Sequence, residues 1–489
     1  MNGYLSSEDT WRGKFWLPDE PDNIQRGIMT YTPDRGVRLT LIGGFDDAEW
    51  VPTGQGNTQR LTDRSKAWAV IHGVVNNKPV TLVDCIMSKS TSYWIGSEVA
   101  EQEIRAERAI LGVLLKDPSY QGFSGIHIEI ENLTEWDYRP DLTFQIKYDE
   151  NHKYTDWTIH VDPADERTVM VGDLTVSLKR WYTLPKHDVR RGRLQGATSA
   201  TSTFALSSNS PKSLDEWTAY ASVAEDLITF AMDAPSAVLR HRLVPTDELA
   251  GDEDAHTRRE VFVYENRIIK GDIDAEGVKG SDALFTLGVD GVDYETIVPR
   301  WFEVRERFRV ACDMILSLVY QSDGYIQSQL ITAVAAAEAF HQALELPPPI
   351  PDSEFKALKK ALKATIPENR RRWLSEKLGR NNPTLRERLL ELASRLDEAV
   401  MKHLLPSPEG WADAAKDARN NVAHGSDSAS QIELLYAVTE VTTAVVIANL
   451  LHELAVPIER ILYAISSSGR LARAAELSRQ HWPAAPNAR

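Results

Sequence analysis

The sequence predicts an α+β multidomain protein, in which a β-rich N-terminal domain, sandwich or barrel-like, precedes an all-α helical bundle. Short runs with a period of two fill the first part of the chain, and apolar stripes at three- and four-residue spacing fill the part after Asp293. A length of 489 residues is too great for a single core. We expect a β-rich domain over residues 1–210, an α/β extension of it over 211–297 and the bundle over 298–489.

Alternating apolar and polar residues mark the strands of the first domain, as at Val37–Leu41, Ile126–Ile130 and Leu174–Leu178. The strands are short and turn-rich segments separate them, which is typical of a sandwich or a barrel-like sheet. An apolar stripe predicts one helical insertion over 97–115. The members of that stripe are Val99, Ile104, Ala109, Ile110 and Val113.

The α/β extension is expected to open with a helix that runs from Pro211 to about Met232. Ser213 and Glu216 have the spacing of a capping box at its start. Strands are expected after it, over 237–244, 261–269 and 284–289.

The bundle is expected to contain helices over about 301–318, 326–344, 385–403, 411–423 and 432–454. The three consecutive prolines within Leu346–Pro351 must end the second of these, because proline has no N–H and a fixed φ. The longest apolar run, Val441–Leu451, is too short to span a bilayer and predicts a buried helix. With no signal-peptide pattern near Met1, we expect a cytoplasmic protein without a membrane partner.

Composition excludes several classes of function. The net charge of −16 repels nucleic acid, so a polyanionic substrate needs a local basic patch. Two cysteines, Cys85 and Cys312, are too few for a disulfide scaffold or an all-cysteine zinc site. The sequence has no Walker-type phosphate loop, no histidine or cysteine pairs at zinc spacing and no G-x-S-x-G elbow. We therefore expect no metal and no cofactor.

One short pattern carries chemistry: Arg419-Asn-Asn-Val-Ala-His424, an R-x4-H motif. Chance alone gives about one match to R-x4–6-H in a chain of this composition, and Arg180 to His187 also matches. On an ideal helix, positions 419 and 424 lie about 140° apart around the axis. The pair can therefore be a solvated arginine with a capping histidine. It can also act on one ligand if the last turn unwinds or if a second copy completes the site.

The region from Arg300 to about Leu462 resembles a HEPN domain. Asn420 fits the polar position after the motif arginine, and the helix Leu330–Phe340 looks like the first bundle helix, on which Glu338 matches an acidic residue that faces the motif. The whole chain resembles the ApeA family of anti-phage defence proteins. The residues that carry this resemblance at the front are Gly13–Pro18, Gly27–Met29 and Leu39–Gly43.

The resemblance implies a metal-independent endoribonuclease of abortive infection, with Arg419, Asn420, His424 and Glu338 as catalytic residues. HEPN relatives pair two motif helices across a dimer, so a homodimer or higher oligomer is implied. Histidine suits proton transfer to and from the 2′-OH and the leaving oxygen, and arginine forks onto phosphate oxygens. The N-terminal domain would sense a phage component and restrain the nuclease.

A basic stretch gives RNA a path to such a site. The stretch from Glu354 to Arg388 contains eleven lysines and arginines and four glutamates. Its net charge is therefore +7, whereas the net charge of the whole chain is −16. Trp373 is either a stacking face for a base or a core residue. The expected RNA-binding residues are Lys359, Lys360, Lys363, Arg370, Arg371, Arg372, Lys377 and Arg380.

Two points stay open, namely the role of the bundle and the role of the tryptophans in the β-rich domain. The bundle can be a non-catalytic HEPN dimerisation module attached to a ligand-binding β domain. Within that domain, five tryptophans either line a recognition surface or belong to the core, and they are Trp11, Trp16, Trp50, Trp68 and Trp94.

Overall fold

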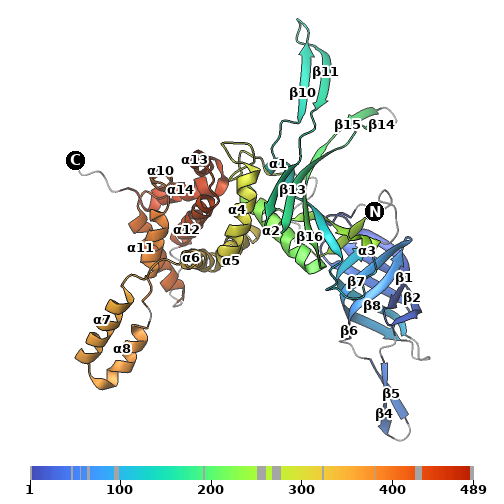
Figure 1. Ribbon diagram of the computed structural model, residues 1–489, viewed down its shortest axis with the longest axis horizontal. Coiled ribbons are helices and arrows are strands. Elements are labelled where there is room, and N and C mark those ends of the chain that lie inside the picture. The colour runs from blue at the N-terminus through green and yellow to red at the C-terminus, as the bar shows by residue number, and fades with distance from the viewer. Residues whose placement is uncertain are drawn as a thin grey trace. The chain divides into compact units, whose positions relative to one another are not determined.

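The structure is a computed structural model of the chain. It describes residues 3–45, 48–54, 57–62, 66–92, 99–184, 186–190, 193–250, 260–266, 277–321, 324–379, 381–423 and 432–484. The chain divides into two compact units, Met1–Val278 and Lys279–Arg489. Figure 1 shows the strands of the first unit and the helices of the second.

The first unit is β-rich, as the sequence predicts. Its strands are β1 (Asp9–Leu17), β2 (Glu20–Thr32), β3 (Gly36–Ile42), β4 (Ala48–Gly54), β5 (Asn57–Thr62), β6 (Ala67–Val75), β7 (Lys78–Ser92), β8 (Val99–Leu111), β9 (Phe123–Ile130), β10 (Leu142–Tyr148), β11 (Tyr154–Val161), β12 (Arg167–Val171), β13 (Leu174–Tyr182), β14 (Lys186–Arg190), β15 (Arg193–Ala197), β16 (Ala200–Lys212), β17 (Val238–Pro245) and β18 (Val261–Glu265). Its helices are α1 (Leu133–Trp136), α2 (Leu214–Met232) and α3 (Asp247–Ala250).

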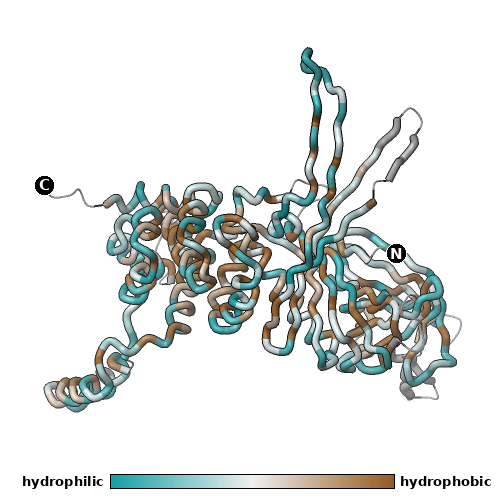
Figure 2. The backbone as a smooth tube through the Cα atoms, turned by 45° about the horizontal axis from the view of Figure 1, so that its top comes forward, coloured by the Kyte–Doolittle hydropathy of each residue, from teal (hydrophilic) through white to brown (hydrophobic). Residues whose placement is uncertain are grey.

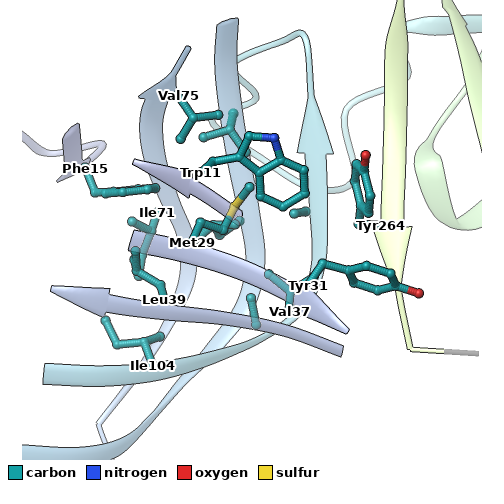
Figure 3. Close-up of a cluster of buried hydrophobic side chains, with 14 of the residues drawn as sticks. Trp11, Phe15, Met29, Tyr31, Val37, Leu39, Ile71, Val75, Ile104 and Tyr264 are labelled. Carbon is teal, nitrogen blue, oxygen red and sulfur yellow. The ribbon is translucent and has the colours of Figure 1, made fainter. Parts of the chain in front are cut away.

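Six strands close into a barrel in the order β8–β3–β2–β1–β6–β7, because β7 pairs back with β8. Closure satisfies the backbone groups that an open sheet would leave at its edges. Alternate side chains point inward and fill the barrel with a buried cluster that includes Trp11, Met29, Tyr31 and Ile104 (Figure 3). Trp11 is therefore a core residue.

The rest of the main sheet leaves the barrel at β8, in the order β18–β17–β9–β16–β13–β12. Helix α2 packs on β9 and β16, and the indole N–H of Trp217 donates to the carbonyl of Phe123 at 3.0 Å. The expected capping box of α2 is confirmed, since Ser213 and Glu216 exchange hydrogen bonds. Three further hairpins form separate two-stranded sheets, β4–β5, β10–β11 and β14–β15.

The helix expected over 97–115 is wrong, because residues 99–111 of this segment form strand β8. The barrel-facing positions of β8 do not keep a period of two, because Ile104 and Ala106 are followed by Ala109 and Leu111, and polar residues are buried between the apolar ones. Gln102 is fully buried, and its side-chain amide bonds both the N–H and the carbonyl of Phe45. Arg108 is also buried and donates to Asp215 at 2.5 Å.

The second unit is a helical bundle, again as expected. Its helices are α4 (Tyr294–Arg307), α5 (Arg309–Tyr320), α6 (Ile326–Ala343), α7 (Asp352–Thr365), the 3₁₀ turn η1 (Glu368–Arg370), α8 (Arg371–Lys377), α9 (Leu385–Ser394), α10 (Glu398–Leu404), α11 (Pro408–Ala423), α12 (Ile432–Glu453), α13 (Ile458–Ser467) and α14 (Gly469–His481).

Helix α12 is the centre of this bundle. Among the described helices it is long and apolar enough to cross a membrane, but 83% of its most apolar window is buried within the bundle. Helices α6, α9, α11 and α14 all contact it. Figure 2 shows hydrophobic segments gathered inside the bundle. The predicted buried helix is thus confirmed as the core helix.

The strand expected over 284–289 is also wrong, because this segment has no strand partner. Its backbone carbonyls are bound by a side chain instead. The guanidinium of Arg460, itself buried, donates to the carbonyls of Ala283 at 2.7 Å and Leu284 at 2.9 Å.

Arg180, which belongs to the second match of the R-x4–6-H pattern, has a structural role in the β-rich unit. Its guanidinium forks onto Asp141 at 2.8 and 3.1 Å and donates to Ser202 at 2.9 Å. Burial alone would raise the pKa of Asp141, but hydrogen bonds from Tyr182 and Arg180 outweigh it and hold that pKa below its ordinary value. The network ties β13 and β16 to the loop before β10.

Replacing this arginine, Arg180→Met, is expected to destabilise the protein by about 3–5 kcal/mol, because it leaves the buried carboxylate of Asp141 without its cation. The pKa of Asp141 is lowered on folding, so its stabilising effect is present above an unfolded-state pKa of about 3.9 and is lost as the pH falls through the folded-state value. Thermal unfolding at pH 7 measures the loss. The exposed Arg38 provides the control, and Arg38→Met should change stability by less than about 0.5 kcal/mol. Equal effects of the two changes would contradict this role for Arg180.

Candidate functional site

Helix α11 positions the first residues of the R-x4-H motif. Its buried face is formed by Trp411, Ala412, Ala415 and Ala418, at helical spacing. The indole N–H of Trp411 donates to the hydroxyl of Thr442 on α12 at 3.2 Å, which anchors α11 to the core helix. The small alanines let α11 pack closely. The opposite face therefore points to solvent.

Arg419 follows Ala412 and Ala415 at helical spacing, but it lies in the last turns of α11 and is exposed, while Asn420 is half-buried. The guanidinium Nη1 donates to the side-chain oxygen of Asn420 at 3.5 Å, which is long for a hydrogen bond. The two polar groups thus lie together in the last turns of α11. His424, the third member of the motif, lies outside the described residues.

A charge network fixes α11 one to two turns earlier. Arg386 on α9 forks onto Asp413 at 2.8 and 3.4 Å, and Lys416 lies 3.7 Å from the same carboxylate. The hydrogen bond from Arg386 lowers the pKa of Asp413 below its ordinary value. This network holds α9 against α11, and the sequence analysis did not identify Asp413 as part of it.

Glu338 lies on α6, half-buried, in the wall of an open pocket of about 520 Å³. His341, Gln342 and Arg388 line the same pocket. Helices α6 and α11 do contact each other, but no described residue of α11 lines this pocket. Within the described chain, Glu338 is therefore grouped with His341 and Arg388, and Arg419 with Asn420.

The buried His341 pairs its Nε2 with the carboxylate of Glu391 on α9. The sequence analysis missed this pair. Glu338 and His341 are three residues apart on one helix, so both reach the same pocket. That spacing was the available signal, and Glu391 could not be paired with His341 without the fold.

The basic stretch forms a helical projection, defined here as α7, η1 and α8 (residues 352–377). No residue of these three elements is buried. Figure 1 shows α7 and α8 extending away from the rest of the bundle. Trp373 is 59% exposed, so the alternative that it is a core residue is wrong.

The expected RNA-binding cations are spread over this helical projection. Five are exposed, namely Lys360, Arg370, Arg371, Arg372 and Lys377, while Lys359 and Lys363 are half-buried. Arg372 also pairs with Glu376 at 3.2 Å. Arg380 lies outside the described residues. The projection offers cationic groups and an indole face to solvent together.

Two family models match the chain. The model of ApeA N-terminal domain 1 matches residues 10–301, which is more than half of the sequence. The chain belongs to the ApeA family. The model of the Apea-like HEPN domain matches residues 331–460. No curated protein and no solved structure matches the chain.

The family assignment confirms the resemblance stated from the sequence. The HEPN match begins in α6 and ends in α13, so it includes Glu338, the helical projection and the motif at 419–424. The ApeA match includes the barrel and the sheet that continues from it. Together the two matches support a HEPN-type defence effector, a class that is generally associated with nucleases.

Proposed function

We propose that this ApeA-family chain is a metal-independent endoribonuclease of anti-phage defence, acting by abortive infection in the cytoplasm. The observation that carries the proposal is the position of Arg419 and Asn420. They lie in the last turns of α11, a helix anchored to the bundle core, within the region that the HEPN model matches, and Arg419 is exposed. An exposed guanidinium beside an amide suits a phosphate ligand.

The proposed reaction uses the substrate's own 2′-hydroxyl. Its oxygen attacks the adjacent phosphorus, and the bond from phosphorus to the 5′-oxygen breaks. The 2′ proton passes to a base, and the leaving 5′-oxygen takes a proton from an acid. His424 carries out this proton transfer, Arg419 stabilises the charge on the phosphorane oxygens, and Asn420 donates to the phosphate or orients His424. The products carry a 2′,3′-cyclic phosphate and a free 5′-hydroxyl.

A second copy of the chain completes the proposed site. One chain supplies a single Arg419 and a single His424, at positions that diverge by about 140° on an ideal helix. Two α11 ends that meet in a homodimer bring an arginine and a histidine from different copies to one phosphate. Glu338, on α6, is assigned a supporting role.

The substrate reaches the site along the helical projection. Its exposed cations oppose the net charge of the whole chain and attract the RNA backbone, and Trp373 offers a face on which a base can stack. Because no residue of the projection is buried, a hydrophobic core of its own does not stabilise it. This favours a binding role for the projection.

We also propose that the β-rich unit senses a phage component and governs the nuclease. The alternative is a non-catalytic HEPN dimerisation module with a ligand-binding β domain. The nuclease proposal predicts RNA cleavage that substitution of the motif abolishes. The alternative predicts no RNA cleavage that depends on the motif.

The variants His424→Ala and Arg419→Ala are expected to lower RNA cleavage by about 10²–10⁴-fold, the range for loss of an acid–base group or a charge-stabilising donor. Cleavage of a labelled RNA by the purified protein measures the effect, and EDTA should not change the wild-type rate. Lys416→Ala is the matched control, since it removes a cation from the same helix. The proposal fails if His424→Ala cuts at the wild-type rate, or if a substrate with 2′-deoxyribose at the cut site is still cleaved.

The variant Trp373→Ala is expected to weaken RNA binding by about 1–3 kcal/mol per lost stack without lowering the melting temperature, because the indole is exposed. Fluorescence anisotropy with a catalytically inactive background measures binding. The control is the exposed Trp157→Ala, in the β-rich unit. The affinity for RNA should also fall as the salt concentration rises. The slope of log affinity against log salt concentration should become shallower when Arg370, Arg371 and Arg372 are changed to glutamine. An unchanged slope would mean that RNA binds to a surface other than the helical projection.

A chain that starts at residue 279 lacks the β-rich unit and is expected to lose its dependence on phage infection. Plaque counts and host growth, with and without phage, measure the response. The motif variant His424→Ala in the full chain controls for toxicity that is unrelated to cleavage. Protection by the shortened chain at the full-length level would argue against a sensor.

A further inference from the structure

A second pocket, of about 260 Å³, lies within the β-rich unit, on the sheet that continues from the barrel. Four adjacent strands, β13, β16, β9 and β17, form its floor. Arg242 pairs with His127 and Arg240 with Glu129 across β17 and β9, so all four side chains share one face of the sheet. The opposite face is apolar and packs on the core, as Ile128 and Phe204 show. The pocket is therefore a polar site on a rigid support.

The floor of the pocket contains a buried hydroxyl without a partner. Thr203 is only 4% exposed, and its Oγ1 has no hydrogen-bond partner among the residues that the structure describes. A buried hydroxyl without a hydrogen bond destabilises the folded protein, because it has lost its bonds to water and gained none in return. A polar ligand group in the pocket removes that destabilisation.

The walls of the pocket donate hydrogen bonds. Arg242 donates to Nδ1 of His127, and an arginine has only donors, so Nδ1 accepts and Nε2 carries the proton. Burial, helped by the charge of Arg242, lowers the pKa of His127 to about 4, so the ring is neutral near pH 7. Arg240 pairs with Glu129 and stacks over Tyr4 at 4.8 Å. Arg242 also pairs with Glu260 at 3.3 Å, so each guanidinium has one carboxylate partner, and the lining is rich in N–H donors without an excess of positive charge.

An aromatic side chain completes the site. Trp181 on β13 lies opposite Thr201 of β16 and is 53% exposed, although it lines the pocket. An exposed indole beside a lining rich in N–H donors provides a stacking face next to an anion site. A volume of 260 Å³ corresponds to about nine water molecules at about 30 Å³ each, which suits one ring with one anionic group.

We propose that this pocket binds a small anionic ligand with a planar ring, of the class of a nucleoside monophosphate. The ring stacks on Trp181, and the phosphate takes hydrogen bonds from Arg242, from Nε2 of His127 and from Thr203. The inference does not depend on ribonuclease activity, and it gives the β-rich unit a small-molecule ligand of its own.

Isothermal titration calorimetry on the full-length protein tests the proposal, with the four common nucleoside monophosphates, adenosine and inorganic phosphate as separate probes. At least one nucleotide should bind at least tenfold more tightly than either adenosine or phosphate. Thr203→Val, which keeps the side-chain volume, should weaken that binding about tenfold without lowering the melting temperature, and Trp181→Ala should do the same. Trp157→Ala, which also removes an exposed indole, is the control and should bind normally.

Three outcomes would overturn the inference. The first is that none of the four nucleotides binds, and the second is that phosphate binds as tightly as the best nucleotide. The third is that Thr203→Val leaves nucleotide affinity unchanged. If these nucleotides fail while Thr203→Val weakens the binding of a single-stranded RNA, the pocket is an RNA contact and not a small-molecule site.

Discussion

Burying helix α12 on all sides is the constraint from which the bundle follows. Its fifteen described buried residues include the consecutive Val445, Val446, Ile447 and Ala448, which lie about 100° apart around the axis and so point in every direction. A helix that is apolar all round has to be enclosed by others. Helices α6, α9, α11 and α14 provide that enclosure, and each must turn a narrow apolar stripe inward. Their other faces are left for polar chemistry.

Helix α11 shows how this constraint produces a candidate site. Because Trp411 and three alanines have to face α12 and its neighbours, the helix cannot rotate, and the exposed Arg419 in its last turns is held in place. The Arg386–Asp413 pair adds a second fixed point from α9. Rigid support for an exposed cation is what a phosphate site requires, because the binding energy is not spent on ordering the side chain.

The sequence predicted the larger elements well because their signals are local. The capping box of α2, the extent of α6 and the apolar length of α12 depend on residues a few positions apart. Strand β8 was mistaken for a helix because its barrel-facing residues step from Ala106 to Ala109, and because the buried Gln102 and Arg108 are polar, each satisfied by a partner distant in the chain. The grouping of Arg242 with His127, 115 residues apart, depends on strand register and had no local signal at all. The motif at 419–424 could be found from the sequence, but the pairing of His341 with Glu391 could not.

The closed barrel also has a consequence for the order of folding. All six of its strands lie within the first 111 residues, so the ring can close while the ribosome is still making the rest of the chain. Strand β18, which pairs with β8 from Arg108 to Leu111, comes about 150 residues later, and it brings Phe262 and Tyr264 into the barrel core. Until β18 has been synthesised, residues 108–111 of β8 lack this partner strand, and the barrel core lacks Phe262 and Tyr264. The nascent chain therefore passes through a stage in which this edge of β8 is open to pairing with another chain, and synthesis of β18 ends it.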